Sequence, residues 1–83
     1  MMYPSINING TARETLERDY LTALDAVRDA IVALKITAPH GRDYMMPGTY
    51  ITDAQSEHTV RLSHLAAVEA ELEMLLDHII DRE

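Results

Sequence analysis

The residues best suited to bind an anion gather in one stretch in the middle of the chain. Residues 35–61 contain three basic and three acidic side chains, whereas the remaining residues contain four basic and eleven acidic ones. The candidate ligand-binding residues in this stretch are His40, Arg42, Tyr44, His58 and Arg61. A guanidinium can hold a phosphate through two parallel hydrogen bonds, and an aromatic ring offers a flat face for a base. We therefore predict a site for a phosphate-bearing ligand here. The alternative is that these charges are only solvated and that the tyrosines close the end of a helical bundle.

The same sequence offers no arrangement for catalysis. It has no cysteine, which excludes a thiolate zinc site and a cysteine nucleophile. No glycine-rich phosphate loop or Ser/His/Asp order is present, so no nucleophile or base can be named. His58 and His64 are six residues apart, which places them on different faces of one helix and disfavours a shared metal ion. We expect a protein that is not an enzyme, with no catalytic residue, no metal and no cofactor.

A helical pattern of apolar residues precedes the candidate ligand-binding residues in the chain. Thr11 and Glu14 have the spacing of a capping box, in which two side chains satisfy backbone N–H groups at a helix start. The apolar residues that follow recur every three or four positions, as one face of a helix requires. They are Leu16, Tyr20, Leu24, Val27, Ile31 and Leu34. The pattern predicts a helix over residues 11–36. Residues 1–10, which contain a proline and an Asn-Gly turn signal, predict an extended N-terminal arm.

A second helix is predicted over residues 52–81, beginning with a capping box of Thr52 and Gln55. Its apolar stripe contains Leu62, Leu65, Val68, Leu72, Leu75 and Ile79, and Leu76 and Ile80 widen it near the end. Prolines and glycines between the two helices predict a structured loop over residues 37–51, because neither residue suits a helix interior.

These elements predict an all-α fold in which residues 11–83 form an antiparallel two-helix hairpin. Two helices share only one seam, and a chain this small usually needs a disulfide, a metal or self-association for stability. The apolar residues near the C-terminus are more than one partner helix can cover. They are Leu65, Leu72, Leu76, Ile79 and Ile80. We therefore expect a homo-oligomeric helical bundle with this stripe between subunits.

Charge and hydropathy restrict the other partners. A net charge of −7 and an isoelectric point near 4.9 disfavour binding to a nucleic acid polymer or to an anionic membrane. No long apolar segment and no signal-peptide pattern occur, so we expect a cytoplasmic protein.

The run from Ala38 to Tyr44, followed by a helix that carries His58 and Arg61, resembles small uncharacterised helical-hairpin proteins of bacteriophages and prophages. In that family a His-Gly-Arg-Asp-Tyr-Tyr run leads into a Pro and Gly turn, and the resemblance covers about half of the chain. Met45 stands here in place of the family's second tyrosine. The resemblance implies a viral protein of the host cytoplasm. Its architecture is similar to that of phage oligomers that sequester cyclic nucleotide signals of host defence, which suggests an anti-defence role.

Three functions stay open at this point. In the first, the oligomer sequesters a phosphate-bearing nucleotide at the hairpin tip. In the second, acidic helix surfaces that include Asp25, Asp29, Glu69 and Glu73 cover a basic patch on a host protein and inhibit it. In the third, the chain is a structural phage component without a small ligand.

Overall fold

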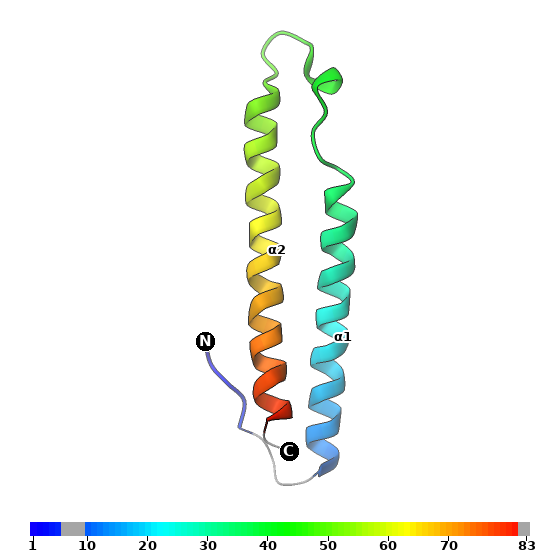
Figure 1. Ribbon diagram of the computed structural model, residues 1–83, viewed down its shortest axis with the longest axis vertical. Helices are drawn as coiled ribbons and strands as arrows, with labels where there is room; N and C mark the ends of the chain where they lie inside the picture. Colours follow the sequence, from blue (N-terminus) through cyan, green and yellow to red (C-terminus); the bar gives the residue numbers. More distant parts are fainter. Residues whose placement is uncertain (6–9, 82–83) are drawn as a thin grey trace.

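The computed structural model describes residues 1–5 and 10–81 and shows two long helices joined by a loop (Figure 1). Helix α1 spans Gly10–Lys35 and helix α2 spans Ile51–Ile80, and a short 3-10 helix, η1, spans Gly41–Tyr44 in the loop. Each long helix begins and ends within one residue of its predicted bounds. The two helices contact each other and no strand occurs among the described residues, so the predicted all-α hairpin is confirmed.

The hairpin is a rod rather than a sphere. Its extents are 62 × 20 × 14 Å and its radius of gyration is 18.4 Å, whereas a compact domain of this length has a radius near about 12 Å. The accessible surface is 6222 Å², against about 5,000 Å² for a typical monomer of this mass. The isolated chain therefore leaves more surface in contact with water than a compact domain would.

The seam between the helices follows a spacing of three and four residues on both sides. The predicted α1 stripe, from Leu16 to Leu34, is buried or half-buried at every position. The inward positions of α2 are Ala54, His58, Leu62, Leu65, Glu69, Leu72, Leu76 and Ile79. This row passes through Glu69, whereas the predicted stripe passed through Val68, which is 41% exposed. The predicted α2 stripe is therefore wrong at Val68, and it omitted the buried Ala54 and His58.

The apolar residues near the end of α2 do not all lie on one surface, as the prediction assumed. Leu76 is 8% exposed and Ile79 is 0% exposed within the single chain, whereas Ile80 is 40% exposed. Leu76 and Ile79 thus belong to the hairpin seam, and we correct the expectation that they lie between subunits.

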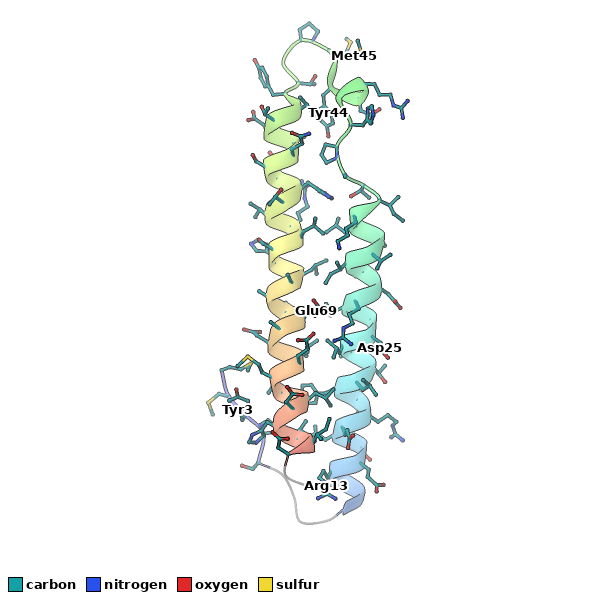
Figure 2. The ribbon with its side chains drawn as sticks, viewed as in Figure 1. Tyr3, Arg13, Asp25, Tyr44, Met45 and Glu69 are labelled. Carbon is teal, nitrogen blue, oxygen red and sulfur yellow. The ribbon has the colours of Figure 1, made fainter. Side chains whose placement is uncertain are left out.

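An ion-pair cluster joins the helices near their middle. Arg28 of α1 donates from Nε to Oε2 of Glu69 at 3.1 Å and from Nη2 to Oε1 of Glu73 at 2.8 Å. Figure 2 shows Glu69 on the side of α2 that faces α1. The hydrogen bonds accepted by Glu73 and Glu69 raise the pKa of Arg28 above its ordinary value. Because one arginine bridges two acidic residues one helical turn apart, the cluster helps to fix the register of the hairpin.

The helix ends are stabilised by local hydrogen bonds. At the end of α1, the backbone N and the hydroxyl of Thr37 both donate to the Leu34 carbonyl, at 2.9 and 2.7 Å. Pro39 follows, and the residue before a proline disfavours helical backbone. At the start of α1, the predicted capping box depends on the side chain of Thr11, which is not among the side chains that the structure describes.

The start of α2 differs from the prediction. The N-cap residue is Tyr50, and its side chain makes no capping hydrogen bond. Thr52 already lies inside the first turn, because the helix begins one residue before it. The predicted capping box of Thr52 and Gln55 is therefore wrong. The acidic residue of the first turn is Asp53, whose charge suits the positive end of the helix dipole.

The loop between the helices contains a tight turn whose sequence explains its geometry. Thr49 N donates to the Met46 carbonyl at 3.1 Å, and Gly48 between them has φ +85°. Pro47 precedes Gly48, and a proline followed by a residue of positive φ is typical of a type II turn. Gly48 is the described glycine at which a side chain would be strained.

The N-terminal arm returns to α2. Residues 1–5 have no regular structure and lie on the side of α2 away from α1 (Figures 1 and 2). The ring of Tyr3 lies 4.8 Å from that of His78, at a tilt of 41°. The rest of the predicted arm, residues 6–9, lies outside the described residues. Neither described helix is long and apolar enough to cross a membrane.

Candidate functional site

The predicted site residues occupy the tip of the hairpin, where α2 extends beyond the end of α1 (Figure 1). The first turns of α2 have no α1 residue opposite them, yet Ala54 and His58 are buried there. Residues 36–50, which connect the helices, therefore cover this part of α2. Within this connection Pro39 and Tyr44 are half-buried and the other residues are exposed.

His40 and Arg42 lie at the start of η1. His40 is the N-cap residue of this 3-10 helix, and its Nδ1 accepts a hydrogen bond from the backbone N of Arg42 at 3.3 Å. Both side chains are exposed. Arg42 forms no side-chain ion pair with any described residue, so its guanidinium is available to a ligand. His40 stabilises the backbone of η1, the short helix that contains Arg42.

Tyr44 and His58 face the interior of the tip instead. Tyr44 is half-buried and lies between η1 and the first turns of α2 (Figure 2). His58 is 7% exposed and occupies an inward position of α2. Neither side chain is placed as a free stacking or ligating group. The alternative expectation, that a tyrosine closes the open end, describes Tyr44 better, whereas Tyr50 is 64% exposed.

Arg61 lies one turn further along α2 and has an acidic neighbour. Its Nη2 is 3.6 Å from Oε2 of Glu57, an i,i+4 pair in which both side chains are largely exposed. Such pairs are weak in water, so an anion can compete with Glu57 for the guanidinium. Among the described residues, the hydrogen bond from Arg42 to His40 is the one polar contact that joins two of the five predicted site residues.

The tip does provide backbone donors. The first N–H groups of an α-helix have no partner within the helix, and an N-cap side chain normally satisfies one of them. In α2 this does not happen, because Tyr50 makes no such bond. The exposed Arg42 and the start of α2 thus belong to the same end of the molecule. Helix N-terminal N–H groups and a guanidinium are groups that bind phosphate.

The acidic helix surface differs from its expectation. Glu69 and Glu73 are engaged by Arg28, so two of the four acidic residues expected to meet a host protein instead link the hairpin. Asp25 and Asp29 remain exposed. Beside this cluster is a hollow of about 380 Å³ between the helices. It is lined by Leu21, Leu24, Arg28, Glu73, Leu76 and Asp77. The sequence feature that could have indicated this ion-pair cluster is the pair of glutamates four residues apart, Glu69 and Glu73, which a single arginine can bridge.

Comparisons with protein-family models, with curated proteins and with solved structures find no match to this chain. The resemblance to phage helical-hairpin proteins therefore stays a prediction from the loop residues, and the function is argued from the geometry of the tip.

Proposed function

We propose that this chain is a small self-associating binding protein that holds a phosphate-bearing ligand, of the nucleotide class, at the tip of its helical hairpin. The observation that carries the proposal is the uncapped start of α2 at the same end as the exposed guanidinium of Arg42. Both groups favour an anion, and together they offer backbone and side-chain hydrogen bonds to phosphate oxygens.

The charge distribution supports this end of the molecule over the other. The acidic excess of the chain falls outside residues 35–61. An anion approaching the tip therefore meets less electrostatic repulsion than one approaching the helices outside residues 35–61. Arg61 lies about 15 Å along α2 from Ile51, so its guanidinium would serve only a ligand that extends along the helix from the tip. A likeness in size and helical build to phage oligomers that sequester cyclic nucleotide signals of host defence makes such a signal the ligand we propose, and binding alone would sequester it.

The direct test is a thermal-shift screen of the purified protein against inorganic phosphate and mono-, di- and cyclic nucleotides. A ligand that binds only the folded chain raises its melting temperature. Arg42→Ala should weaken binding of the best compound by about tenfold or more, since a charge-assisted hydrogen bond contributes roughly 1.5–3 kcal/mol. Asp53→Asn should strengthen it, because the variant removes a negative charge from the first turn of α2.

The control is Arg18→Ala, which removes an exposed arginine from the opposite end of the hairpin and should leave binding unchanged. No shift with any phosphate compound would refute the ligand. Equal weakening by Arg18→Ala and Arg42→Ala would show that general charge attraction, and not the tip, is responsible.

A further inference from the structure

The hairpin has two broad faces, and the Arg28 cluster identifies one of them. Successive residues of an α-helix are turned by about 100°. On α1, Arg28 is turned by about 40° around the helix axis from the buried Leu24. On α2, Glu73 is turned from the buried Leu76 toward the same face of the hairpin, because its side chain is bonded to that of Arg28. We call the face that carries Leu21, Arg28, Glu73 and Asp77 the Arg28 face.

The opposite face, which we call the back face, is formed by small and apolar residues. They are Ala23, Val27 and Ala30 of α1 and Val68, Leu72 and Leu75 of α2. Rotation by about 100° per residue turns each of them away from the Arg28 face. Ala23, Ala30 and Val68 are exposed, and the other three are half-buried. Val27 and Leu72 lie at the edge of the hairpin seam and are partly covered there, whereas Ala23, Ala30 and Val68 stay in contact with water.

The charges of α1 avoid the back face. Between Tyr20 and Leu34 the charged residues are Asp25, Arg28 and Asp29. All three are turned from Leu24 in the direction opposite to Val27. Alanines at two of the α1 positions also allow another helix to approach closely.

We infer that the back face is the interface with a second copy of this chain, so that two hairpins form a four-helix bundle. This inference rests on the self-association in the proposed function and names the surface that carries it. The surface of the chain exceeds that of a compact monomer by about 1,200 Å². A stable dimer buries about 800 Å² on each partner. A rod with a broad face of 62 × 20 Å is large enough to supply that area.

A second copy fits this surface better than an acidic or basic partner. The six named residues of the face are uncharged, whereas Glu71 is turned about 40° from Leu75 and Arg61 continues the row of Val68 toward the tip. The apolar centre of the face is complementary to itself under a twofold axis. Each chain carries a net charge of −7, and association through the back face leaves the charges of the Arg28 face at the outside of the bundle.

The test uses a matched pair of valines. Val68 lies on the back face and is 41% exposed, whereas Val32 is 64% exposed and is turned from Leu24 toward the Arg28 face. The wild-type protein should sediment as a dimer of twice 9.4 kDa. Val68→Glu should raise the dimer dissociation constant about a hundredfold or more, because each copy would bury an unpaired carboxylate. Val32→Glu should leave the dimer intact. Circular dichroism checks that both variants remain helical.

A second measurement does not depend on a disruptive variant. The chain has no cysteine, so a single introduced thiol reports on its own surroundings. Ala30→Cys on the back face should react with a maleimide at least about tenfold more slowly than Ala66→Cys, which replaces an exposed alanine outside it. Equal labelling rates would overturn the inference.

Other outcomes are equally decisive. A monomeric wild-type protein would refute a second copy as the occupant, and dissociation by Val32→Glu but not by Val68→Glu would place the interface on the Arg28 face. Neither assay contains a ligand, and Arg42→Ala should keep the dimer mass. Failure of the interface and failure of the tip site are therefore distinguishable.

Discussion

The adjacent isoleucines at the end of α2 provide a sharp test of how the hairpin is packed. Ile79 is 0% exposed and Ile80 is 40% exposed, although the two residues have the same side chain and occupy the same helical turn. Replacing each by alanine removes the same three carbon atoms. The difference between the two variants therefore measures burial, with helix propensity and composition held constant.

The expected magnitudes follow from these exposures. Burial contributes about 0.8 kcal/mol for each methylene, so the three carbons of Ile79 account for about 2.4 kcal/mol. The cavity that remains adds to this loss, and we expect Ile79→Ala to lower the free energy of unfolding by about 3 kcal/mol. At Ile80 water already reaches the side chain and no closed cavity forms, so we expect a loss of about 1 kcal/mol. For a domain of this size, the first loss is a large share of a total of roughly 4–12 kcal/mol.

The assay is guanidinium unfolding followed by circular dichroism at one fixed protein concentration, because the proposed self-association would make the apparent stability depend on concentration. A melting experiment should show the same order, with a shift of about 4–8 °C for each kcal/mol. Equal losses in the two variants would refute the reasoning. They would mean that Ile80 is as buried as Ile79 in the assembled protein, and hence that something covers the side of α2 next to the Arg28 face.

Two further predictions concern the Arg28 cluster and the loop turn. Arg28→Ala should lower the melting temperature more than the control Arg18→Ala on the same helix, and the difference should shrink in about 1 M salt, since the ion pairs are solvent-accessible. The pKa of Arg28 is raised, so the stability that the ion pairs contribute is fully present below the ordinary arginine pKa and is lost only as the pH rises through the raised value. The difference in melting temperature between the two arginine variants should therefore stay constant from roughly pH 6 to 9. Gly48→Ala should lower the free energy of unfolding by about 1 kcal/mol, because φ +85° disfavours a side chain, whereas Gly41→Ala should have little effect in its open surroundings. Equal effects of the two glycine variants in chemical unfolding would contradict the argument from the turn.

The sequence predicted the helices well and the α2 seam less well, for a physical reason. Every predicted α1 position from Leu16 to Leu34 is buried or half-buried, although Val27 also lies at the edge of the back face. In α2 two inward positions are polar, His58 and Glu69. A stripe drawn through apolar residues alone passes over both of them and selects Val68. The role of Glu69 depends on Arg28, which is 41 residues away, and periodicity within one helix carries no information about that distance.

The candidate site shows a similar limit. Residue type and position correctly suggested that the tip is less acidic than the helices, but not which side chains stay exposed there. Tyr44 and His58 are drawn inward because α2 extends past α1 and leaves an apolar surface that the loop must cover. The cap assignment failed for a local reason. The extended backbone of Tyr50 places the N-cap two residues earlier than the predicted cap at Thr52.

Apolar area alone does not distinguish the two broad faces of this hairpin, because Leu21 and Val32 are exposed near the Arg28 face, at 45% and 64%. Charge distinguishes them. Arg28 neutralises only one of its two glutamate partners, and Asp77 lies beside the same hollow, so this face keeps a net negative charge. Two copies pressed together there would bring like charges close to one another, and salt screens charges incompletely within the Debye length of about 8 Å at physiological ionic strength. In the proposed dimer the cluster thus does more than join the helices, because it disfavours association through one face and leaves the less charged back face for the second copy.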